Sequence, residues 1–190
     1  MAGLSGLYGA GMGLTVVSLV VMGVSGSGKT TVASEVARRL GWDFTEGDDH
    51  HPAANVAKMK AGHALDDEDR WPWLRELAAW IGAHEAEGRS CVLTCSALKR
   101  SYRDLLRDGH PSVWFAHVSG PQELITERVQ KRSGHYMPPS LVPSQFAALE
   151  PLGDDEPGRV VPASGGPEQA VEDLLADLAR ERGVTLPSSP

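Results

Sequence analysis

The sequence has few cysteines, and those present show no sign of a cross-link or a metal site. Cys91 and Cys95 are the only cysteines among 190 residues. They share one apolar run, where a disulfide would need a sharp bend and no partner ligands for a metal lie nearby. On a strand, their spacing of four puts both side chains on one face. We interpret them as small buried hydrophobic residues, a usage that agrees with a reducing, cytoplasmic compartment.

The N-terminus lacks the features of a targeting or membrane segment. Residues 1–28 contain no lysine or arginine, so the basic region of a signal peptide is missing. The apolar run 14–24 is about eleven residues long, which is too short to span a bilayer. We therefore expect no membrane association, and we interpret residues 1–13, rich in glycine and alanine, as a flexible extension.

Positive charge is also scarce. The chain has 18 lysines and arginines against 25 acidic residues, a formal net charge of −7, which argues against a nucleic-acid-binding surface. Hydrophobic residues make up 41% and charged residues 23%, ordinary values for a globular chain long enough for one domain. Cations that bind an anionic ligand must then be concentrated locally.

Extended and helical patterns alternate along the chain. The expected strands are 15–24, 42–45, 90–95, 112–118 and 159–161, and the expected helices are 29–40, 52–61, 66–87, 98–106, 121–132, 144–149 and 167–182. Pro72 lies in the first turns of the third helix, which favours a true start near Trp71. The alternation predicts an α/β fold with a five-stranded parallel sheet flanked by helices. We expect one domain over 14–185, with a mobile lid at about 128–150 and a frayed tail at 186–190.

One motif carries a specific chemistry. Residues 23–30, GVSGSGKT, match the phosphate-binding loop G-x-x-x-x-G-K-[ST], with an expected buried strand before the loop and an expected helix after it. From Gly23 onward, glycines let the backbone turn tightly and aim its N–H groups at an anion, and the following helix adds its positive end. Lys29 reaches the β- and γ-phosphates as a point charge, and Thr30 offers its hydroxyl to Mg²⁺. ATP is favoured over GTP because the sequence has no Asn-Lys-x-Asp run. The loop alone does not separate a kinase from an ATPase, a switch or a motor.

Acidic residues follow the second expected strand. Ligands of an open α/β sheet bind at the carboxyl ends of its strands, so Asp48 is expected beside the phosphate loop. A kinase needs a group that orients and deprotonates the attacking hydroxyl, and we assign Asp48 to that role. The alternative is a turn or helix-cap role, which we prefer for Asp49 and His50. Glu46 is expected to support Mg²⁺ through water.

Cations appear at two further places before residue 104. Arg70 follows the acids 66–69 and suits a substrate carboxylate, with a salt bridge to those acids as the alternative. Lys99, Arg100 and Arg103 lie within five residues after the third expected strand. They suit an anionic ligand, with a purely surface role as the alternative.

A last group of cations precedes the stretch predicted to be mobile. Arg128, Lys131 and Arg132 lie at the end of the helix expected at 121–132. Cations on a closing lid would stabilise charge on the transferring phosphoryl group and exclude water.

Together these blocks resemble the gluconokinase family. They are GVSGSGKT at 23–30, EGDDHHP at 46–52, LDDEDR-x-PWL at 65–74, CSALKR-x-YR at 95–103 and R-x-GH at 132–135, with Gln145-Phe146 and Leu149-Glu150. The phosphate loop is generic, but the other blocks in this order are specific, and the resemblance spans about 16–180. It implies a three-layer, nucleoside-monophosphate-kinase-like fold and a homodimer. It also implies ATP-dependent phosphorylation of D-gluconate to 6-phospho-D-gluconate, which feeds the pentose phosphate and Entner-Doudoroff routes.

The resemblance assigns roles by position. Those that would hold the ATP phosphates are Ser25, Gly26, Ser27, Gly28, Lys29, Thr30 and Thr31. Those that would face the acceptor are Asp48, His51, Arg70, Lys99, Arg103 and His135, with Gln145 near the substrate. Arg128 and Arg132 would act from the lid. A similarity to shikimate kinase gives Glu46 the metal position and Asp48 the substrate position.

The sequence departs from the family in two segments. Residues 137–144 contain three prolines, and residues 162–167 lack the acids expected there, which leaves adenine contacts to backbone groups. The alternative function is another small-molecule kinase of the same fold, with shikimate or a nucleotide as acceptor. A nucleotide kinase would have little use for the Asp48 and His51 block. A nucleotide-dependent switch without an acceptor is disfavoured by the cationic blocks.

Overall fold

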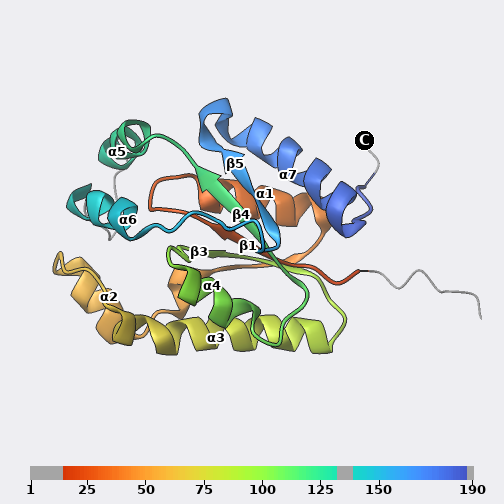
Figure 1. Cartoon of the computed structure of the whole chain (residues 1–190), viewed down its shortest axis with the longest axis horizontal. Coiled ribbons are helices and arrows are strands. Elements are labelled where there is room, and N and C mark those ends of the chain that lie inside the picture. Colours follow the sequence, from red (N-terminus) through yellow and green to blue (C-terminus); the bar gives the residue numbers. More distant parts are fainter. Residues whose placement is uncertain (1–14, 132–138, 188–190) are drawn as a thin grey trace, which may run out of the picture.

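The computed structural model describes residues 15–131 and 139–187, and its strands form one sheet (Figure 1). The strands are β1 Ser18–Met22, β2 Asp43–Glu46, β3 Cys91–Cys95, β4 Val113–Ser119 and β5 Gly158–Pro162. Their order is β2-β3-β1-β4-β5, and all neighbours are parallel. The predicted five-stranded parallel sheet is confirmed. The expected extension at 1–13 and the end of the expected tail lie outside the described residues.

Helices cover both faces of the sheet, as predicted. They are α1 Lys29–Leu40, α2 Ala53–Lys60, α3 Asp67–Ala86, α4 Arg100–Arg107, α5 Gln122–Lys131, α6 Val142–Ala148 and α7 Gly166–Arg182. Figure 1 shows α1 and α7 on one side of the sheet and α3 and α4 on the other. In β1, Leu19 and Val21 join the core cluster on the α1 side, while Val20 and Met22 join the cluster on the α3 side. Because both faces are covered, the central strands β1, β3 and β4 are mostly apolar, with Ser18, Thr94 and His117 as buried polar exceptions. Among the described helices, none has the length and apolar character needed to cross a bilayer.

Helix α3 begins at Asp67, four residues before the predicted start at Trp71. The prediction was wrong because a capping box supports the earlier start. The Asp66 carboxylate accepts the Asp69 N–H at 2.9 Å, and the Asp69 carboxylate accepts the Asp66 N–H at 3.0 Å. These bonds satisfy free donors of the first turn. Pro72 therefore lies inside the helix, where it removes one backbone hydrogen bond.

Helices α5 and α6 lie together beyond the carboxyl ends of the strands, at the left of Figure 1. A small apolar cluster packs them against the start of the phosphate loop. It comprises Val24, Leu98, Ile125, Val129 and Val142. Helix α6 and the last residues of α5 belong to the segment predicted as a lid, 128–150, whose mobility stays a prediction.

Candidate active site

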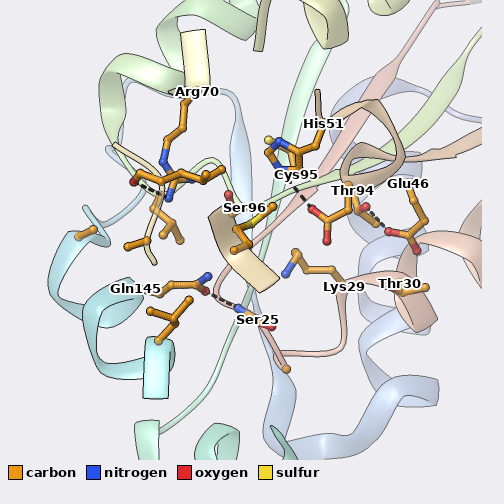
Figure 2. A pocket seen from close by; sticks show the side chains of 18 of the residues that line it. Ser25, Lys29, Thr30, Glu46, His51, Arg70, Thr94, Cys95, Ser96 and Gln145 are labelled. Carbon is orange, nitrogen blue, oxygen red and sulfur yellow. Dashed lines mark hydrogen bonds and ion pairs between the residues drawn. The ribbon is translucent and has the colours of Figure 1, made fainter. Parts of the chain in front are cut away.

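A cavity of about 320 Å³ lies at the carboxyl ends of the strands, where the phosphate loop, the end of β2, the end of β3 and α6 meet (Figure 2). The loop residues predicted for the nucleotide that line it are Ser25, Gly26, Gly28, Lys29, Thr30 and Thr31. The residues predicted for metal and acceptor that line it are Glu46, Asp48, His51, Arg70 and Gln145. The fold thus brings most of the predicted site residues to one cavity.

The phosphate loop joins β1 to α1. Gly26 has φ 81°, and a Cβ there would lie 2.3 Å from Cγ2 of Val129. Glycine therefore serves both the positive φ and the close approach of α5. Helix α1 begins at Lys29, so its free N–H groups and the positive end of its dipole face the cavity.

The first turn of α1 supplies the cation and the hydroxyl of the motif. The ammonium of Lys29 donates to the carbonyl of Val24 at 3.0 Å and points into the cavity in Figure 2. Thr30 is exposed on the cavity wall. Both groups thus lie where the loop would hold phosphate oxygens.

Glu46 ends β2 and has one carboxylate oxygen in need of a partner. The Thr94 hydroxyl donates to its Oε2 at 2.5 Å. Its Oε1 is buried and has no hydrogen-bond partner within the described ranges, and such a buried oxygen calls for water or a cation. Glu46 and Thr30 line the same cavity. This donor set fits Mg²⁺, which takes few protein ligands and completes its shell with water and phosphate oxygens.

Asp48 lies in the short helix η1, Gly47–His50, directly after β2. A Cβ on Gly47 would lie 2.1 Å from the carbonyl oxygen of Thr94, so only glycine fits this turn. The indole N–H of Trp73 donates to the Gly47 carbonyl at 2.7 Å. No side chain caps η1 or α2, which removes the cap alternative for Asp48. The turn thus holds the Asp48 carboxylate at the cavity.

His51 presents a neutral ring to the cavity. Its imidazole stacks on Trp73, with ring centroids 4.1 Å apart and planes at 20°. Burial lowers the pKa of His51 to about 4, and the nearby Arg70 charge also lowers it, against the opposing effect of Asp48. The ring nitrogen Nε2 lies 3.9 Å from Asp48 Oδ1. A neutral imidazole in this position can accept a hydrogen bond from a hydroxyl.

Arg70 lies in the first turns of α3, and its side chain lines the cavity. One guanidinium nitrogen donates to the carbonyl of Leu65 at 3.3 Å. Three of the four acids proposed as alternative partners of Arg70 bind other cations. Asp66 and Asp69 accept from Lys58, and Asp67 accepts from Lys99. The geometry therefore suits the predicted role toward a carboxylate.

Two residues predicted to face the acceptor do not line the cavity. Lys99 Nζ donates to both carboxylate oxygens of Asp67, at 2.7 and 2.9 Å, which is the surface role kept as its alternative. Arg103 is fully buried, and its guanidinium binds Glu156. The assignment of Arg103 to the acceptor is corrected, because α4 turns this side chain toward the core.

Helix α6 places Gln145 over the phosphate loop. The Ser25 N–H donates to Gln145 Oε1 at 2.7 Å, as the dashed line in Figure 2 shows. The Gln145 side chain is also buried and lines the cavity. It therefore joins α6 directly to the nucleotide side of the site.

Arg128 borders a second cavity, of about 270 Å³, on the other side of the phosphate loop. Its guanidinium donates to the carbonyl of Ala163 at 3.0 Å. Ser27 also lines this cavity, and its buried hydroxyl has no hydrogen-bond partner among the described residues. The two other lid residues predicted, Arg132 and His135, lie outside the described residues.

His117, in β4, is expected to make stability depend on pH. Burial, together with the nearby charges of Arg103 and Lys29, lowers its pKa to about 4. The unfolded chain then binds more protons between that value and about 6.5, so stability is highest above this range and falls as pH falls through it. We expect His117 to contribute a loss on the order of 1–2 kcal/mol between pH 7 and pH 5, measured by urea unfolding at both values.

The variant His117→Gln tests this prediction. It should lose less stability than the unchanged protein between the two pH values. The exposed His63 provides the control, because His63→Gln should retain the full pH dependence. Equal losses in His117→Gln and His63→Gln would contradict the prediction.

Sequence reasoning missed residues that support the site from behind. The Thr94 hydroxyl donates to the Glu46 carboxylate and accepts the Gly47 N–H. The sequence feature that could have identified Thr94 is a polar side chain near the end of an apolar strand. Trp73 holds the Gly47 carbonyl and stacks on His51. Glu156 gave no local signal, because its partner lies 53 positions away.

Comparison with known proteins gives consistent matches. A family model described as an AAA domain matches residues 19–149. A gluconokinase of Gluconobacter oxydans (strain 621H) is 49% identical over 170 residues, which cover 90% of this chain and 96% of that protein. The unliganded crystal structure of a Janibacter sugar kinase is 51% identical with a TM-score of 0.84, covering 90% of this chain and 99% of that one. A gluconokinase structure from Sinorhizobium meliloti 1021 is 42% identical with a TM-score of 0.78, covering 89% and 95%.

Proposed function

Because the chain belongs to the gluconokinase family, we propose that it transfers the γ-phosphate of ATP to D-gluconate and forms 6-phospho-D-gluconate. One observation carries the proposal. A single cavity joins the phosphate loop at Lys29 to a carboxylate, a neutral imidazole and a guanidinium, those of Asp48, His51 and Arg70. An ATPase or a switch without an acceptor has no use for this second set.

The nucleotide would bind across the phosphate loop. Backbone N–H groups and the start of α1 would hold the phosphates, with Lys29 at the β- and γ-phosphates. Thr30, with Glu46 through water, would hold Mg²⁺, which neutralises phosphate charge when bound. The second cavity, bordered by Arg128 and Ala163, suits the nucleoside, since it adjoins the same loop and offers backbone groups.

The acceptor would lie between β2, β3 and α3. Arg70 pairs with the carboxylate of gluconate, and neutral His51 accepts a hydrogen bond from a hydroxyl of the chain. Asp48 orients the terminal hydroxyl and accepts its proton as the new oxygen–phosphorus bond forms. The bond from the γ-phosphorus to the bridging oxygen breaks, and ADP leaves.

A coupled assay of ADP release tests the proposal. With ATP and Mg²⁺, gluconate should give ADP at a rate far above that with shikimate or a nucleoside monophosphate. Phosphorus NMR should identify 6-phospho-D-gluconate as the product. No ADP with gluconate would refute the proposal, and turnover with shikimate or a nucleotide instead would favour the alternative kinase. The homodimer implied by the resemblance and the cytoplasmic location favoured by the cysteine usage stay predictions.

A further inference from the structure

The Arg103–Glu156 pair is a buried ionic contact that the proposed chemistry does not use. Both side chains have no exposed surface. Arg103 Nε donates to Glu156 Oε1 at 2.6 Å, and Nη2 donates to Oε2 at 2.9 Å. Burial by itself would raise the pKa of the Glu156 carboxyl, but hydrogen bonds from Arg103 and the Gly153 N–H hold it below its usual value. Such pairs add little to stability over an apolar pair, so another role deserves a test.

The remaining donors of Arg103 go to two segments far apart in the chain. Nη1 donates to the carbonyls of Ala97 and Leu98, both at 3.2 Å. Nη1 and Nη2 also donate to the carbonyls of Glu150 and Pro151, both at 3.1 Å. The first two carbonyls lie between β3 and α4, and the last two directly follow α6. One guanidinium therefore ties these two segments together.

The segment between β3 and α4 forms a wall of the active-site cavity. Ser96 and Leu98 line the cavity, and the Ser96 carbonyl accepts the N–H of Gly23 at 3.3 Å. Ala97 between them has φ 41°, a conformation that costs a non-glycine residue on the order of 1 kcal/mol or more. Arg103 binds the carbonyl of this residue and thereby holds the strained wall in place.

The segment after α6 connects to the part of the cavity wall that α6 forms with Ser144, Gln145 and Ala148. The Glu150 N–H donates to the Leu98 carbonyl at 2.8 Å, and α6 carries Gln145, which accepts the Ser25 N–H. Hydrogen bonds and short stretches of backbone thus form a closed circuit that includes four residues of the cavity lining, Ser25, Ser96, Leu98 and Gln145. It runs from the phosphate loop through Ser96 to Arg103, and returns through Glu150 and α6.

We propose that Arg103, clamped by Glu156, is a positioning residue for phosphoryl transfer. It fixes the acceptor wall at Ser96–Leu98 relative to α6 and the phosphate loop. The inference rests on the proposed function, because it assigns this clamp to the reaction between ATP and gluconate. Arg103 touches neither reactant. It acts through the backbone it holds.

The variant Arg103→Lys tests the proposal, because it keeps the charge beside Glu156 but cannot reach four carbonyls and a carboxylate together. We expect kcat with gluconate to fall about 10- to 100-fold, since a misplacement of about 1 Å costs about this much. The affinity for an ATP analogue should stay within about 2-fold, because the phosphate loop keeps its own backbone geometry. A purely structural role predicts instead that kcat and nucleotide affinity fall together with the melting temperature.

Two further variants complete the experiment. Arg107→Lys is the matched control, because Arg107 lies one turn later on α4, is partly exposed and binds Asp104 at the surface; it should retain kcat. Glu156→Gln keeps the shape of the Glu156 side chain but removes its negative charge beside Arg103. It is measured in the same experiment and replaces Arg103→Lys as the test if that variant fails to fold. It should also lower kcat more than nucleotide affinity.

Hydrogen exchange separates failure of this proposal from failure of the proposed function. In Arg103→Lys the Glu150 amide, bonded to Leu98 in the unchanged protein, should exchange faster whatever the acceptor is. If the unchanged protein phosphorylates gluconate and the variant keeps its kcat, the positioning role is overturned. If the unchanged protein does not use gluconate, the proposed function fails by itself. In that case, an unchanged exchange rate of the Glu150 amide in Arg103→Lys would also overturn the positioning role of Arg103.

Discussion

Replacing Lys29 with alanine is expected to abolish phosphoryl transfer, with kcat falling about 1,000-fold or more. Removal of one well-placed donor to a developing charge costs about 10²–10³ in rate, and Lys29 supplies a full charge at the β- and γ-phosphates. The side chain is partly exposed and points into the cavity, so its loss should leave the core intact. ADP release with gluconate measures the rate, and thermal unfolding measures the fold.

The control for this prediction is Lys60→Ala. Lys60 is exposed at the end of α2 and does not line the cavity, so its loss should leave kcat within about 2-fold, as is usual for surface changes. Activity of Lys29→Ala near that of Lys60→Ala would exclude the assignment of the phosphate loop.

The substitution Asp48→Asn is expected to lower kcat about 100- to 10,000-fold. General base catalysis contributes about this much, and asparagine has the shape of aspartate but cannot accept the hydroxyl proton. Gly47 and Trp73 hold the backbone of this turn, so the variant should fold normally. Steady-state kinetics with gluconate should show the loss in kcat, with a smaller change in KM.

Asp49→Asn provides the matched control for Asp48. Asp49 lies in the same short helix but is exposed and does not line the cavity, and its substitution should be nearly silent. A loss below about 10-fold in Asp48→Asn would reject the base role. A loose transition state with little need for a base would then leave Asp48 an orienting function alone.

The sequence and the structure agree best where local chemistry decides. The helix predicted at 29–40 is observed at Lys29–Leu40, because the glycine loop directly precedes its first residue and Gly41 ends it. Both cysteines are buried, as expected from their apolar run. The start of α3 shows the limit of one local rule. Pro72 favoured a later start of the helix. The side chains of Asp66 and Asp69 instead bind free backbone N–H groups at the start of α3 and allow the earlier start.

Arg70 and Arg103 show why the acceptor side was only partly predictable. Each lies in a stretch rich in charged residues, and a charge pattern does not tell which way the side chain turns. The spacing from Arg103 to Leu106 placed both on one helix face, and both are buried. That signal could have moved Arg103 from the acceptor to the core. Its partner Glu156 lies in a loop before β5, with no pattern that joins the two.

By itself the sequence determined the phosphate loop, the alternation of strands and helices, and the family. These follow from backbone preferences and from residues close together in the chain. Only the tertiary structure decided which cations reach the cavity and which are used elsewhere, because that choice depends on contacts between distant segments. Arg70 reaches the cavity, Lys99 pairs with Asp67, and Arg103 pairs with Glu156. A buried guanidinium must satisfy all its donors, and only the folded chain brings the carboxylate and four carbonyls that do so.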